Sequence, residues 1–113
     1  MRHTYRQFLE EMSRSDPKEF DSRTLVILTH LLKLHFLSGE LRRRNELGWK
    51  RSVGTQQVEI MSIINDVPSL KRRGSPQNIQ KLYTLAIRDF HVDYPGVHVP
   101  PQCPFSIETI LGG

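Results

Sequence analysis

The feature that most constrains the fold is the segment LVILTHLLKLHF at residues 25–36, which is almost wholly apolar apart from His30, Lys33 and His35. An ordinary surface helix is apolar over roughly a third of its circumference, whereas this segment exceeds that share. The large apolar side chains are Leu25, Leu28, Leu31, Leu32 and Phe36. Such a helix needs several neighbours to cover it, so the segment predicts the central helix of an all-α domain.

Residues on either side of this segment set the expected length of the helix. Asp16 can cap the first turn, Pro17 fits the first helical position, and Glu19 can reach back to the N–H of the cap. Gly39 offers a stop at the other end. We therefore predict a helix over residues 17–38.

Apolar residues keep helical spacing in three further segments. Tyr5 and Met12 belong to the stripe of the first, Pro68 closes the second, and Ser75 followed by Pro76 marks the start of the third. The predicted helices span about residues 3–13, 49–66 and 76–94. Together with the central helix they indicate a small four-helix bundle.

The C-terminal part of the chain is rich in proline. YPGVHVPPQCPF holds four prolines and a glycine, which excludes a regular helix and favours an extended strap over residues 95–105. Ser106 can cap a short final turn over residues 106–111. A chain of 113 residues fits one domain, so we expect residues 1–113 to form a single helical domain.

Composition narrows the class of protein. The longest nearly apolar run is far shorter than the roughly 20 residues that cross a bilayer, so no membrane segment is expected. The start, MRHTYRQFLEE, lacks the apolar core of a secretory signal. Cys103 is the single cysteine and cannot form an internal disulfide, which suits a reducing compartment. We expect a cytoplasmic protein.

A polar stripe along the central helix is the first candidate site. Arg23, His30 and Lys33 fall near one line at helical steps of three and seven residues. They form a candidate cationic pocket for an acidic ligand or a partner's acidic side chain. The alternative is structural: the stripe faces solvent, or His30 hydrogen-bonds Gln56 or Glu59 of the next helix.

Basic residues supply the second candidate site. The chain has a formal net charge of +4, and its basic residues are clustered. The segment LRRRNELGWKR can neutralise phosphates, and its tryptophan can stack on a base. Its candidate nucleic-acid contacts are Arg42, Arg43, Arg44, Trp49, Lys50 and Arg51. A second group, Lys71 to Arg73, is expected at the opposite end of the bundle, so the two do not form one patch. The alternative is solvated loops whose cations stabilise helix C-termini, with Trp49 as a packing residue.

Enzyme chemistry has little support in the sequence. No phosphate-binding glycine loop, HExxH, CxxC or nucleophile elbow occurs. His91, His98 and Cys103 match no standard zinc spacing, and Cys103 is expected to be a small packing residue. We therefore predict no catalytic residues, no cofactor and no metal.

Several ordered motifs resemble a known bacterial family, the domain-of-unknown-function family numbered twenty-nine. They are HLLK at His30 to Lys33, Trp49 with Lys50, PSL at Pro68 to Leu70, and CPF at Cys103 to Phe105. The resemblance covers about residues 10–111 and implies a small all-helical bundle without implying an activity. The resemblance also leads us to expect a further N-terminal helical stretch before the segment FLEEM, whereas nine residues precede Glu10 in this sequence. Apolar surface on the first two helices is then expected to be open to a homodimer or a protein partner.

The sequence therefore predicts a non-catalytic helical interaction module with an unknown protein partner or a second copy of itself. The alternative is a weak, salt-dependent nucleic-acid-binding protein, and an enzyme of unrecognised type comes third.

Overall fold

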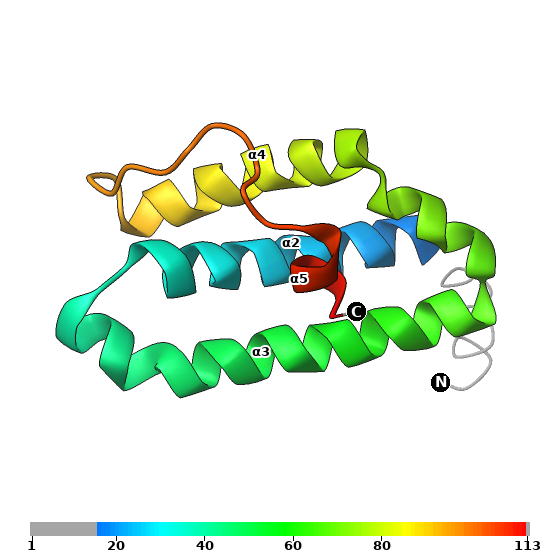
Figure 1. Ribbon diagram of the computed structural model, residues 1–113, viewed down its shortest axis with the longest axis horizontal. Helices are drawn as coiled ribbons and strands as arrows, with labels where there is room; N and C mark the ends of the chain where they lie inside the picture. Colours follow the sequence, from blue (N-terminus) through cyan, green and yellow to red (C-terminus); the bar gives the residue numbers. More distant parts are fainter. Residues whose placement is uncertain (1–15, 113) are drawn as a thin grey trace, which may run out of the picture.

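The computed structural model describes residues 16–112. Within this range the chain is helical, without any strand, and it ends in a proline-rich strap and a short last helix (Figure 1). The elements are α2 (Asp16–Phe36), α3 (Gly39–Asp66), the 3₁₀ helix η1 (Pro68–Gly74), α4 (Pro76–Asp93) and α5 (Ile107–Leu111). The predicted all-α bundle is confirmed. The helix predicted at residues 3–13 lies outside the described residues.

The central helix is α2, which lies between α3 and α4 and packs against both (Figure 1). Phe20, Ile27, Leu28 and Leu32 are fully buried on it. Burying a side chain of this size contributes about 1.5 to 3 kcal/mol, so helix α2 anchors the core. Its apolar circumference therefore has the neighbours that the sequence predicts.

Helix α3 begins ten residues earlier than the predicted start at Trp49. The α2–α3 turn uses Gly39, whose φ of 74° is in the left-handed region that glycine adopts without strain. The next residues, ELRRRNEL, are mostly good helix formers and carry ion pairs one helical turn apart. Propensity and charge thus form a helix where the apolar period is weak, and the expected basic loop is part of α3.

The segment between α3 and α4 is also helical, where the sequence suggested a loop. It forms η1, with Leu70 buried against the core. Arg73 donates two hydrogen bonds to the Asp21 carboxylate of α2, which also accepts one from the Asn78 side chain at 3.1 Å. This cluster fixes η1 to both neighbouring helices at the end of the bundle away from the start of α3 (Figure 1).

Helix α4 starts as predicted, with the Ser75 hydroxyl accepting a hydrogen bond from the backbone N–H of Asn78 at 3.2 Å. The strap then returns along α4 (Figure 1), held by three of its side chains. Gln80 bonds the backbone of Pro101 and Cys103, Tyr83 donates to the Pro100 carbonyl, and His91 bonds the Val97 carbonyl. The strap delivers α5 to a position where it contacts both α2 and α3.

Candidate functional site

The predicted pocket on α2 is divided among separate partners. Arg23 donates to Glu19 at 2.9 Å and to the Gln56 side-chain oxygen of α3 at 2.9 Å, and lies 3.9 Å from Glu59. Its charge is therefore balanced within a polar bridge between α2 and α3. The structural alternative assigned Gln56 or Glu59 to His30, but in the structure Arg23 takes both.

His30 and Lys33 each have a different neighbour. The His30 Nδ1 atom lies 2.8 Å from the Val26 carbonyl, which can only accept, so Nδ1 carries the hydrogen. The Lys33 ammonium lies 5.8 Å from the centre of the Trp49 ring, within range of a cation–π interaction. Lys33 thus meets a residue that the sequence placed in the other candidate site, and the two sites adjoin.

Most of the basic residues near the start of α3 are paired with acidic residues of the same helix. Arg42 and Lys50 both bond Glu46, and Arg43 bonds Glu40 at 2.8 Å. The hydrogen bond from Lys50 and the nearby charge of Arg42 hold the pKa of Glu46 below its ordinary value. These pairs neutralise part of the cluster.

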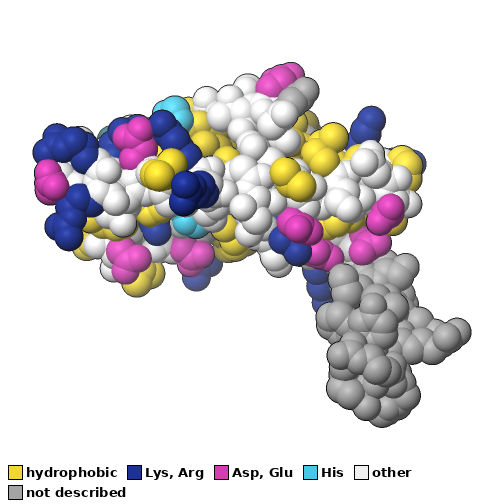
Figure 2. All heavy atoms as spheres, turned by 90° about the horizontal axis from the view of Figure 1, so that it is seen from below, with side chains coloured by type: hydrophobic (Ala, Val, Ile, Leu, Met, Phe, Trp, Pro, Cys, Tyr) yellow, Lys and Arg dark blue, Asp and Glu magenta, His cyan; other side chains and the backbone are white. Residues whose placement is uncertain are grey.

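Arg44 and Arg51 complete the cluster. Both are exposed, and neither forms an ion pair with a residue of the described range. Figure 2 shows the Lys and Arg side chains gathered at the end of the bundle where α3 begins. Trp49 is only 9% exposed and belongs to the core, so it packs as in the structural alternative instead of presenting its ring for stacking.

The histidines and the cysteine near the strap do not form a metal centre. Within residues 16–112 no group of three or more His, Cys, Asp or Glu side chains is placed to hold a metal ion. His91 bonds a backbone carbonyl, and Cys103 donates through its thiol to the Phe105 carbonyl.

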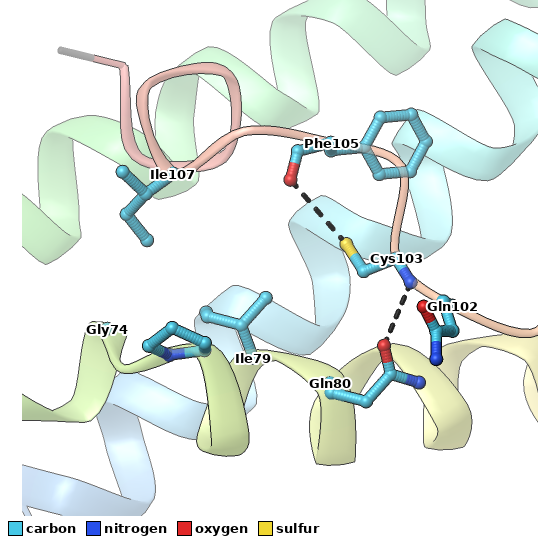
Figure 3. A pocket seen from close by; sticks show the side chains of 8 residues that line it. Gly74, Ile79, Gln80, Gln102, Cys103, Phe105 and Ile107 are labelled. Carbon is cyan, nitrogen blue, oxygen red and sulfur yellow. Dashed lines mark hydrogen bonds between the residues drawn. The ribbon is translucent and has the colours of Figure 1, made fainter.

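Cys103 lies beside a cavity of about 390 Å³ between the strap and the start of α4. Figure 3 shows its backbone N–H donating to the side chain of Gln80, while its thiol points toward Phe105. Burial raises the pKa of the Cys103 thiol, which keeps the sulfur protonated and a poor nucleophile. The arrangement serves packing of the strap.

Helix α3 carries exposed apolar residues on its outward face that the sequence reading did not single out. Leu47 is 61% exposed, Val58 69% and Met61 49%. Figure 2 looks onto this side of the molecule and shows hydrophobic side chains along it. Exposed apolar groups that line up along one helix are a feature of binding surfaces.

Beside Val58 and Met61 the surface is hollowed to a volume of about 610 Å³. The wall on one side is the end of α5, where the Gln57 side chain donates to the carbonyls of Thr109 and Ile110 at 3.2 Å. The lining residues are Gly54, Gln57, Val58, Met61, Ser62, Asn65, Leu111 and Gly112. We call Leu47, Gly54, Val58, Met61 and this hollow the α3 face.

The comparisons with known proteins identify the family. The family described as "Domain of unknown function DUF29" matches residues 7–113. The chain belongs to DUF29. No curated protein and no solved structure matches it.

Membership of DUF29 confirms the resemblance read from the motifs, and it assigns no chemistry to any residue. The structure places the motif residues in packing roles: Trp49 and Leu70 are buried, and Cys103 is half-buried. The apolar surface that we expected to be open on the second predicted helix, now α2, is not found there in this DUF29 chain. No large hydrophobic residue of α2 is among the exposed ones, which lie on α3, α4 and α5. The part of that surface assigned to the first predicted helix lies outside the described residues.

The signal that could have revealed the α3 face was present in the sequence. Leu47, Gly54 and Met61 are seven residues apart, a heptad spacing. It was missed because a predicted start at Trp49 excluded Leu47 from the helix. None of the described helices is long and apolar enough to cross a membrane.

Proposed function

We propose that this DUF29 protein is a non-catalytic interaction module that binds a protein partner through the α3 face. The observation that carries the proposal is the exposure of Leu47, Val58 and Met61 on one side of a single helix, with a hollow of about 610 Å³ at Val58 and Met61. Apolar side chains in water are unfavourable at about 25 cal/mol per Å², and a partner that covers them recovers this free energy.

The absence of catalysis is part of the same proposal. His30 and His91 bond backbone carbonyls, and the raised pKa of Cys103 disfavours its thiolate. Cys103 is the single cysteine and cannot form an internal disulfide, which suits the cytoplasm, where we place the protein.

The test is a charge placed on the α3 face. A tagged full chain is recovered from its native cell after mild cross-linking, as wild type, as Val58→Asp and as the control Val92→Asp. Both valines are exposed, Val58 on α3 at 69% and Val92 on α4 at 79%, so each variant keeps the core intact. We expect the wild type and Val92→Asp to recover the same cross-linked protein and Val58→Asp to lose it. Equal recovery by both variants, or none by the wild type, would contradict the proposal.

Nucleic-acid binding is a second candidate because Arg44 and Arg51 are exposed beside the paired cations at the start of α3. Binding of this kind weakens steeply with salt as counterions are released. Fluorescence anisotropy with generic DNA and RNA between about 50 and 200 mM salt tests it, with an alanine triple variant of Arg42, Arg43 and Arg44. Binding that resists salt, or that survives the triple variant unchanged, would remove this candidate.

A further inference from the structure

The outward side of α3 has the residue spacing of a helix-pairing seam. Steps of four and three residues alternate along it, which is the spacing of the a and d positions in a coiled coil. At 100° per residue these positions stay within about 40° of one line along the helix. They are Leu47, Arg51, Gly54, Val58, Met61 and Asn65, and all but Gly54 are exposed. Such a seam fits one other helix laid along it.

Gly54 lies at the middle of this seam, with Leu47 seven residues before it and Met61 seven residues after it. A two-fold axis beside Gly54 therefore places Leu47 of one helix opposite Met61 of a second copy. Each of these residues lies about 10 Å along its helix from the axis. We propose that the partner is a second copy of this chain, with the two α3 helices antiparallel and crossing at Gly54. This inference rests on the proposed use of the α3 face and names its occupant.

Shape supports this pairing. Leu47 is 61% exposed, whereas the hollow of about 610 Å³ lies around Val58 and Met61 on the other side of Gly54. The rotation brings Leu47 of each copy into the hollow of the other. One surface thus supplies both the inserted side chain and its receptor, as an isologous interface requires.

The distribution of charge along α3 favours an antiparallel arrangement and favours a second α3 helix as the partner. Residues 39–51 carry five basic and two acidic side chains, whereas residues 54–66 carry two acidic side chains and no basic one. An antiparallel pair sets the basic half of each α3 against the acidic half of the other, and it also opposes the two helix dipoles favourably. Arg44 and Asp66, ten and twelve residues from Gly54, lie on the same side of the seam and form one such opposed pair.

Gly54 is not required by the fold of the single chain. A Cβ atom added there would meet no atom within 4 Å, and glycine weakens the interior of a helix. Packing within the single chain therefore does not explain this glycine. Close approach of another backbone at the centre of the exposed seam does explain it, because a larger side chain would hold that backbone away. The same open space surrounds Gly48, which lies on the same helix but about 120° around it from Gly54.

These two glycines provide a matched pair for the first experiment. Sedimentation equilibrium of the full chain over a range of concentrations measures the dimer dissociation constant of wild type, Gly54→Gln and Gly48→Gln. We expect a wild-type dimer that Gly54→Gln weakens at least tenfold and Gly48→Gln leaves within about twofold, because both add the same side chain but only one enters the seam. Equal effects of the two substitutions would overturn the assignment of the axis.

Cysteine cross-linking tests the direction, in a Cys103→Ser background. Gly54→Cys is expected to form a disulfide-linked dimer with itself on mild oxidation. Leu47→Cys alone is expected not to, while a mixture of Leu47→Cys and Met61→Cys chains does, because these positions face each other only in the antiparallel pair. Efficient self-linking of Leu47→Cys would show a parallel pair and overturn the inference.

Charge exchange gives an independent check. Arg44→Glu and Asp66→Arg are each expected to weaken the dimer several-fold, and the double variant to restore it to within about twofold of the wild type. A wild type that remains monomeric at the highest concentration overturns the inference. The proposed function survives that result if Val58→Asp still loses a different cross-linked protein, and it fails as well if nothing is recovered.

Discussion

Single residues in this protein take their roles from the strap as much as from the helices. Tyr83 lies on the apolar stripe of α4 and is fully buried, with its hydroxyl donating to the Pro100 carbonyl at 2.6 Å. Burial raises the pKa of Tyr83 to about 12, and the nearby Cys103 contributes to the shift. The phenol is therefore bound to the fold in its protonated form.

This shift predicts a loss of stability at high pH. The pKa of Tyr83 is raised above its unfolded value of 10.0, so its contribution is complete below pH 10 and disappears as the pH rises toward 12. We expect the free energy of unfolding of the wild type to fall more steeply over pH 10–12 than that of Tyr83→Phe. The substitution itself costs about 1 kcal/mol at pH 8 through the lost hydrogen bond.

Denaturant unfolding followed by circular dichroism at several pH values measures both effects. Tyr94→Phe is the control, since Tyr94 is half-buried at the end of α4. Parallel pH curves for the wild type and Tyr83→Phe would contradict the assignment.

Core positions were predictable at this scale, and hydrogen-bond partners were not. Leu28, Ile60 and Leu82 are buried as their spacing indicates. The hydrogen bond from α2 to Gln56 comes from Arg23 and not from His30, which lies about 10 Å further along the same side of α2 and bonds the Val26 carbonyl. Periodicity fixes which side of a helix faces inward, but it does not resolve which of two polar neighbours reaches a given atom.

At the scale of elements, the clearest departure from the sequence reading is the long α3. Its first ten residues are held by helix propensity and by pairs such as Glu46 with Lys50, and they contribute little to the core. An apolar period is a signal of packing, so it indicates a helix only where the helix packs. The candidate site was affected by the same limit, since the α3 face begins in this segment.

The helical state of this segment predicts that Gly48→Ala stabilises the protein. Gly48 lies inside α3 with nothing within 4 Å of an added Cβ, so alanine gains helix propensity without a clash. We expect the free energy of unfolding to rise by about 0.5 to 1 kcal/mol, whereas a loop at this position would give little change. Thermal unfolding at matched protein concentration measures the difference.

Gly39→Ala serves as the opposite control. Its φ of 74° is unfavourable for alanine, so this substitution is expected to lower the free energy of unfolding by about 1 kcal/mol. A destabilising Gly48→Ala would argue against a helix through residues 39–48.

Across the whole molecule, the two ends of the bundle are held by different contacts. At the start of α3 the ion pairs lie within that helix, and Arg42 also donates to the Leu34 carbonyl of α2 at 2.8 Å. At η1 the Asp21 carboxylate joins three elements. The sequence placed the two basic groups at opposite ends, and Figure 1 agrees. It did not reveal that Arg73 is structural, because its partner Asp21 lies 52 residues away.

The cluster at η1 predicts that Asp21→Ala destabilises the fold by about 1 to 2 kcal/mol, because Arg73 loses its acceptor and Asn78 loses one of two. Glu40→Ala, which removes an exposed pair one turn apart with Arg43, is expected to change stability by less than about 0.5 kcal/mol. Urea unfolding compares the two variants. A similar small effect for both would show that the cluster at η1 does not hold the end of the bundle.

Because α5 packs against α3, cleavage of the strap would affect only one side of each contact in the proposed dimer. Leu111 and Gly112 form one wall of the hollow, whereas Leu47 stands on α3 without help from the C-terminal strap. A protease that cuts the strap and releases α5 would remove this wall of the hollow and leave Leu47 in place. Leu47 of a cleaved chain would still insert into the hollow of an intact chain, but the cleaved chain would no longer receive Leu47 in return. Cleavage would therefore leave asymmetric dimers that keep one of the two symmetry-related contacts.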